Sequence, residues 1–246
     1  MSVPDSVVQV DLKDVLAAGS DPLTNYIHVE PTSSTIVNQK RHTIYYRAGD
    51  EALYGTAITY LVSVDNEKLM SWSNGTDRDQ TYSQTYTTDF KSTTSTEVST
   101  SLSLGPSFEG VSIGSVDIGV KTFDSQETST ESSHTTVTVG AQSDLYFYQR
   151  KYNLQTEVYF TLDAWNDFWI AGSNGGYHVQ IATINSTIST RDYVTRTQAL
   201  TGSARLRFDG QSREGWFGNY VRKFENLTSR AKSTLRSMGI DGSQQG

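Results

Sequence analysis

The chain of 246 residues contains no cysteine, so it can form no disulfide, no thiolate metal site and no cysteine nucleophile. Only four histidines are present, at His28, His42, His134 and His178. None of them lies in a metalloprotease, phosphate-loop or nucleophile-elbow motif. We therefore expect no enzymatic activity, no bound metal and no cofactor.

Basic residues are also scarce, because 20 Lys and Arg stand against 27 Asp and Glu, a net charge of −7. Binding to a phosphate backbone depends on clustered Lys and Arg, so nucleic acid is not an expected partner. The excess of acidic residues is concentrated in one segment of the chain. Residues 92–140 contain six acids and one base, Lys121.

Membrane-targeting segments are missing as well. The first ten residues lack the basic region and apolar run of a secretory signal peptide. No run of 18 apolar residues marks a transmembrane helix. We expect a protein that is soluble when made and is secreted or released without a visible signal peptide.

Serine and threonine, by contrast, dominate residues 92–138. They make up nine of the thirteen residues in 92–104 and nine of the fourteen in 125–138, and the region between these two arms is more apolar and punctuated by glycine. This composition fits either a solvated disordered segment or strands, since Thr and Val suit a pleated surface. The spacing of the apolar residues favours strands.

In the first arm, and again in the centre over residues 116–121, apolar residues fall on even positions and polar residues on odd positions, with a slip near Gly114. Alternation of this kind predicts an amphipathic hairpin, whose tip we place between Gly105 and Ser115. Including residues of the centre, the apolar set is Val98, Leu102, Leu104, Phe108, Val111, Ile113, Val116, Ile118 and Val120. The polar set is Glu97, Ser99, Ser101, Ser103, Asp117 and Lys121.

The rest of the chain predicts a mainly β fold, elongated, with long twisted antiparallel strands. Breaks are expected at Gly49, Gly55 and Asn66, with a turn at residues 74–77. Expected strands cover residues 43–46, 57–64, 69–73, 145–148, 158–162, 177–184 and 204–208. Residues 5–22 fit a helix or a strand equally well.

One amphipathic helix is expected near the C-terminus. Apolar residues recur at three- and four-residue spacing over residues 222–238, and Gly239 is a suitable stop. Aromatic residues before it form a further candidate set, which fits a receptor or membrane contact, or equally a packing cluster. The set is Trp165, Phe168, Trp169, Tyr177, Trp216 and Phe217.

The order of these features along the chain is similar to that of a known protein family. Residues 73–83, Ser-Asn-Gly-Thr-Asp-Arg-Asp-Gln-Thr-Tyr-Ser, lead into a Ser/Thr strand, a glycine-punctuated hairpin, a second Ser/Thr strand and aromatic strands. Over residues 57–162 this order resembles aerolysin-type β-pore-forming toxins, which include epsilon toxin and the mosquitocidal toxins. The usual proline pair after the second strand is absent, as are the family's disulfides. In its lack of cysteine the chain is similar to small members of the family, such as flammutoxin and hydralysin.

The resemblance implies a cytolysin that binds a target-cell membrane, forms a homo-oligomer there and inserts one β-hairpin per subunit into a transmembrane barrel. The apolar set would then face lipid and the polar set would line a cation-preferring lumen. Residues 77–140 would be the pore-forming region. Residues 1–76 and 141–246 would form the sheet scaffold and receptor-facing region, with the C-terminal helix as a restraint released by cleavage near residues 230–236.

Two other interpretations stay open from the sequence. The chain could be a carbohydrate-binding lectin or adhesin whose aromatic set stacks on sugars, with residues 92–138 as a spacer. It could also be a storage or structural β protein without a target. Leakage of dye from liposomes separates the first interpretation from a pore-forming function, because a lectin would agglutinate cells without leakage.

Overall fold

The computed structural model describes residues 24–90, 129–172, 182–211 and 221–238. Almost all of the elements in these ranges are strands. In chain order they are β1 (Thr24–Val29), η1 (Ser33–Thr35), β2 (Ile36–Arg47), β3 (Glu51–Asn74), β4 (Gln80–Phe90), β5 (Ser129–Val139), β6 (Ser143–Ala164), β7 (Asp167–Gly172), β8 (Ala182–Arg196), β9 (Gly202–Leu206), β10 (Val221–Lys223), η3 (Phe224–Asn226) and α4 (Ser229–Ser237). The prediction of a mainly β chain with a short C-terminal helix is confirmed.

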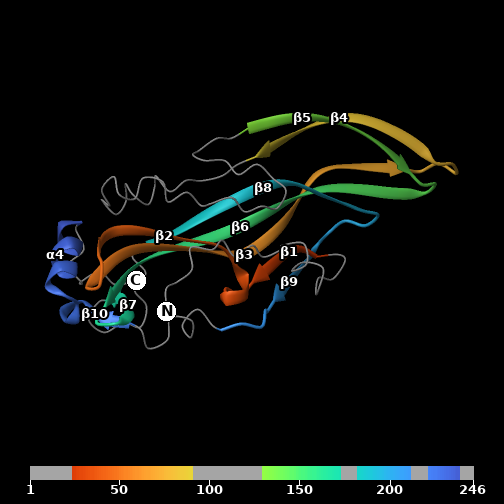
Figure 1. Cartoon of the computed structure of the whole chain (residues 1–246). Coiled ribbons are helices and arrows are strands. Elements are labelled where there is room, and N and C mark those ends of the chain that lie inside the picture. Colours follow the sequence, from red (N-terminus) through yellow and green to blue (C-terminus); the bar gives the residue numbers. More distant parts are fainter. Residues whose placement is uncertain (1–23, 91–128, 173–181, 212–220, 239–246) are drawn as a thin grey trace.

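Two long antiparallel strands, β3 and β6, form the spine of an elongated molecule (Figure 1). Their pairing runs from Glu51 opposite Ala164 to Asn74 opposite Ser143. β2 and β1 pair with β3 in succession, and β8 and β7 pair with β6. β9 and β10 complete this eight-stranded sheet through parallel pairings with β1 and β7.

The strand break predicted at Asn66 is wrong, because Asn66 lies inside β3 and is 7% exposed. Its side-chain amide donates hydrogen bonds to the main-chain oxygens of Thr24, at 3.2 Å, and Asn25, at 3.4 Å. The amide therefore holds the start of β1 against β3. A local pattern assigns Asn66 to a turn, but in the structure its side chain makes a tertiary contact.

The expected break at Gly55 is also wrong, and the strands predicted over residues 145–148 and 158–162 are parts of the single strand β6. Three of the polar residues between them, Gln149, Thr156 and Glu157, are buried. The hydroxyl of Thr59 lies 2.8 Å from that of Thr156. This cross-strand hydrogen bond satisfies two buried hydroxyls, so a polar position continues the core strand.

The helix α4 begins later than the expected residue 222, because Arg222 lies in β10 and Thr228 is the N-cap. The Thr228 hydroxyl accepts a hydrogen bond from the main-chain N of Ala231 at 3.0 Å. The expected stop at Gly239, the segment 5–22 and the first residues of the strand expected over 177–184 lie outside the described residues. None of the described helices is long and apolar enough to cross a membrane.

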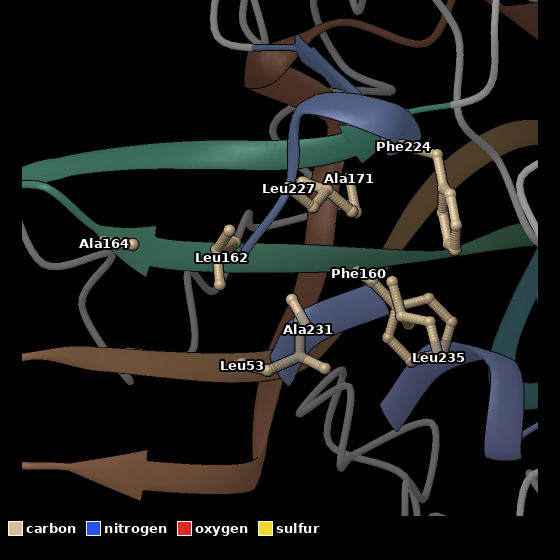
Figure 2. Packing of buried hydrophobic residues seen from close by; sticks show 9 residues of the cluster. All are labelled: Leu53, Phe160, Leu162, Ala164, Ala171, Phe224, Leu227, Ala231 and Leu235. Atoms are coloured by element: carbon tan, nitrogen blue, oxygen red, sulfur yellow. The ribbon is translucent and has the colours of Figure 1, made fainter. Parts of the chain in front are cut away.

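One face of α4 is part of the scaffold core. Ala231 and Leu235 are 0% and 1% exposed and lie against Leu53 of β3 and Phe160 of β6 (Figure 2). Burial of this apolar face explains why a nine-residue helix is stable here, since so short a helix gains most of its stability from packing.

Candidate functional site

The strands β4 and β5 form a separate two-stranded sheet, which is called the ribbon below. Their pairing starts with Gln80 opposite Val139 and ends with Phe90 opposite Ser129, without a register shift. An even-numbered residue of β4 therefore always lies opposite an odd-numbered residue of β5. Because directly opposed side chains share a face, the even positions of β4 and the odd positions of β5 form one surface.

The middle of the ribbon's outer face carries hydroxyl groups and one imidazole. His134 lies between Ser83 and Thr85, with its Nε2 2.7 Å from the Ser83 hydroxyl and its Nδ1 3.3 Å from that of Thr85. The hydroxyls of Ser83 and Thr136 lie 3.1 Å apart. These side chains are exposed, so this face of the ribbon is compatible with water.

The inner face packs on the scaffold through aromatic rings. Tyr86 of β4 lies edge-on to Phe147 of β6 and Tyr193 of β8, with ring centroids 5.3 Å and 6.0 Å apart. Burial raises the pKa of Tyr86 above its ordinary value, and the neighbouring Tyr193 raises this pKa further. Trp72, Val139 and Phe147 are the buried members of this contact, which is called the clasp below. Its partly buried members are Leu69, Met70, Tyr82, Tyr86, Val137, Leu145 and Tyr193.

The ribbon joins the scaffold at a hydrogen-bonded corner. Asn74, 2% exposed, donates through its side-chain amide to the main-chain oxygens of Arg78, Val139 and Gly140, at 2.8, 3.0 and 2.9 Å. Its side-chain oxygen accepts from the main-chain N and the hydroxyl of Thr76. One side chain thus ties both connections between scaffold and ribbon together. The turn predicted at residues 74–77 is confirmed, but it connects two sheets and does not close a two-stranded hairpin.

Side chains alternate along β4, where Tyr82 and Tyr86 are half-buried and their odd-numbered neighbours are exposed. The structure adds Phe147 and Tyr193 as the partners of Tyr86, which no local pattern could pair with it. Lys121 and all other members of the predicted apolar and polar sets lie outside the described residues, within 91–128. Their roles stay predictions.

The described members of the predicted aromatic set do not lie on one face of the sheet. Trp165 lies in the turn after β6, and Trp169 lies opposite Leu162 on the face that carries α4. Phe168 belongs to the other face, with its ring centroid 6.4 Å from that of Tyr54. Tyr177, Trp216 and Phe217 lie outside the described residues.

A residue that sequence analysis missed, Arg222 of β10, brings two of these rings together. Its Cζ lies 4.2 Å from the ring centroid of Trp165 and 4.9 Å from that of Trp169. No sequence motif links Arg222 to the two tryptophans, because the parallel pairing of β10 with β7 creates the contact. Among the described residues, no group of His, Asp and Glu is placed to hold a metal ion.

Comparison with solved structures finds two similar toxins. The oligomeric pore-forming toxin pro-monalysin has a TM-score of 0.33 and 17% identity, over 71% of this chain and 71% of that chain. Parasporin-2, a Bacillus thuringiensis toxin that recognises cancer cells, has a TM-score of 0.20 and 17% identity, over 62% of this chain and 76% of that chain. No protein-family model and no curated protein matches the chain.

Proposed function

We propose that the chain is a pore-forming cytolysin that binds a target membrane as a soluble monomer, oligomerises, and inserts one β-hairpin per subunit into a transmembrane β-barrel. The observation that supports this most directly is the ribbon. It is a two-faced antiparallel pair whose strands enclose residues 91–128, and it lies folded back along the scaffold (Figure 1).

The ribbon can leave the scaffold without unfolding it. Among the described residues, three of the four buried clusters contain no residue of β4 or β5, and only the clasp does. Each aromatic pair in the clasp contributes about 0.5–1.5 kcal/mol beyond the free energy of burying its apolar area. The corner at Asn74 keeps both strands of the ribbon tied together, so they would move as one hairpin.

A single hairpin cannot cross lipid alone, because every main-chain amide needs a partner and the edges of a lone hairpin have none. Several subunits must therefore each contribute a hairpin to a closed barrel. A strand that crosses a tilted barrel needs about 9 to 11 residues. The arms before and after the predicted tip are longer than this, which is consistent with a barrel that extends beyond the bilayer.

The ribbon register places one requirement on the predicted lipid face. Val98, Ile118 and Val120 are all even-numbered, whereas the ribbon pairs even with odd positions. Residues before and after the tip can share a lipid face only if the inserted hairpin shifts register by one residue, as a β-bulge does, either between Phe90 and Val98 or between Val120 and Ser129. Without that shift Lys121 would lie beside Val98 in lipid, at a cost of about 2–4 kcal/mol near the midplane.

Cross-linking of the clasp tests the proposal. Because the chain has no cysteine, a Tyr86→Cys, Tyr193→Cys variant can be joined by a short bis-maleimide and compared with the same variant capped by N-ethylmaleimide. We expect the cross-linked protein to bind liposomes without releasing an entrapped dye, and the capped protein to release it. Equal release from both would contradict insertion of the ribbon. Agglutination without leakage from the unmodified chain would instead indicate a lectin or adhesin.

A further inference from the structure

The turn between β6 and β7 exposes a tryptophan in an unfavourable backbone conformation. Trp165 and Asn166 both have positive φ, 55° and 59°, and the Trp165 side chain is 53% exposed. Two-residue turns with two positive φ values favour Asn and Gly, and a bulky residue in this conformation is an outlier. Strain of this kind persists mainly where a side chain has a function.

The cation beside this tryptophan has unused hydrogen-bond donors. Arg222 donates from its Nε to the main-chain oxygen of Asn226 at 2.7 Å. Among the described residues, no carboxylate forms an ion pair with Arg222 and its terminal nitrogens have no acceptor. The Nε1 of Trp169 is a further donor without a partner there, although it is buried. The cluster therefore offers donors and a positive charge but no acceptor, which suits an anion.

We propose that Trp165, Trp169 and Arg222 bind the phosphodiester group of a membrane phospholipid and so dock the chain on the bilayer, an inference that rests on the pore-forming function proposed above. The terminal nitrogens of Arg222 hold the phosphate oxygens, since a guanidinium fork matches phosphate geometry. The exposed ring of Trp165 lies at the headgroup level, which amphipathic rings favour.

The net charge of the chain indicates which class of phospholipid the site binds. With a net charge of −7, the chain is repelled by a strongly anionic leaflet, and one arginine does not offset that repulsion. A zwitterionic phospholipid supplies the phosphate without a negative surface. The site also has a suitable location, because β4 runs from the 74–79 corner back toward the end of the sheet that carries β7, β10 and α4 (Figure 1).

Flotation of the full chain with phosphatidylcholine vesicles tests the site. We expect Arg222→Gln to bind about tenfold more weakly, because it loses charge-assisted hydrogen bonds to phosphate. Arg222→Lys should recover part of that loss, since it restores the charge without the fork. Trp165→Asn should also bind more weakly, while its thermal unfolding midpoint stays equal or rises because the turn is relaxed. That combination separates a binding role from a folding defect.

Two matched controls remove similar groups elsewhere. Arg78→Gln removes an exposed arginine at the opposite corner, and Tyr46→Ser removes an exposed aromatic residue that is not stacked on a cation. Both should bind like the unchanged chain. The site is refuted if Arg222→Gln binds normally, or if Tyr46→Ser weakens binding as much as Trp165→Asn does. Displacement by inorganic phosphate as efficient as by glycerophosphocholine would show a general anion site and overturn the lipid assignment.

Dye release separates failure of the site from failure of the proposed function. If the unchanged chain releases dye and Arg222→Gln binds and releases equally well, the docking site is wrong and the pore stands. If the unchanged chain binds through Arg222 but never releases dye, the pore is wrong and the docking site stands. At equal amounts of bound protein, Arg222→Gln should release dye as the unchanged chain does.

Discussion

Tyr86 lies edge-on to Phe147, with ring centroids 5.3 Å apart and ring planes at 76°. The two residues belong to different sheets, so this contact joins the ribbon to the scaffold. Tyr193 completes the arrangement, because its ring stacks on that of Phe147 at 5.1 Å and 23°. The strength of this contact should therefore set how readily the ribbon leaves the scaffold.

Removing the Tyr86 ring should weaken the clasp. We expect Tyr86→Ala to lower the free energy of ribbon opening by about 2 kcal/mol, through lost apolar burial and lost ring contacts. Hydrogen exchange of the β4 and β5 amides measures this, and dye release from liposomes should become faster. Thr87→Ala is the control, because Thr87 is exposed on the outer face. Unchanged exchange in Tyr86→Ala would show that the clasp does not hold the ribbon.

Asn74 should be indispensable to the corner. Asn74→Ala leaves three main-chain carbonyls without their donor, so we expect a loss of about 3 kcal/mol in unfolding free energy. Asn74→Asp has nearly the same shape but no amide donor, and it should lose at least as much at neutral pH. Urea denaturation gives both values, with Gln198→Ala at an exposed amide as control. A stable Asn74→Asp variant would show that shape, and not hydrogen bonding, maintains the corner.

The helix α4 should behave as part of the core. We expect Leu235→Ala to cost about 3 kcal/mol, and Ser233→Ala, at an exposed position of the same helix, to stay within about 0.5 kcal/mol. Arg230 and Arg236 lie within the packed α4 region and stack on Tyr45 and Phe224. Trypsin should therefore cut there slowly in the native protein. Rapid cleavage with the scaffold intact would instead favour the sequence hypothesis of a releasable C-terminal helix.

Ionisation of the Tyr45 hydroxyl should lower the free energy of unfolding at alkaline pH. Burial, with a contribution from the nearby Glu51 carboxylate, raises the pKa of Tyr45 to about 12, against an ordinary value of 10.0. The neutral hydroxyl is favoured in the folded state, so its contribution is complete below pH 10 and is lost as pH rises toward 12. Tyr45→Phe should remove that part of the alkaline loss. The measurement is the unfolding midpoint against pH, and identical profiles for both proteins would contradict the assignment.

The proposed register shift can be read from single-cysteine labels. In vesicle-bound protein, we expect an environment-sensitive dye at Leu102→Cys or Ile118→Cys to report lipid and the same dye at Asp117→Cys to report water. Without the shift, positions 102 and 117 would share a face. Blue-shifted emission at 117 together with water-like emission at 118 would therefore exclude the shift and reassign the lipid face of the second arm.

Local patterns in the sequence predicted the strands well and their ends poorly. Alternation of side chains makes β4 a two-faced strand at Tyr82 and Tyr86, because the side-chain period of a strand depends only on the backbone. The predicted break at Asn66 failed because its amide is used by β1, which lies some 40 residues earlier. The late start of α4 likewise follows from the pairing of Arg222 in β10.

Composition and a side-chain period of two account for the mainly β class, the absence of thiol chemistry, the acid excess and the two-faced character of the ribbon, and both are properties of the sequence. Which residues meet depends instead on the tertiary fold. The clasp of Tyr86, Phe147 and Tyr193 requires strands far apart in the chain to fold onto one another. The stacking of Arg222 on Trp165 depends in the same way on a parallel pairing of β10 with β7, which no local spacing encodes.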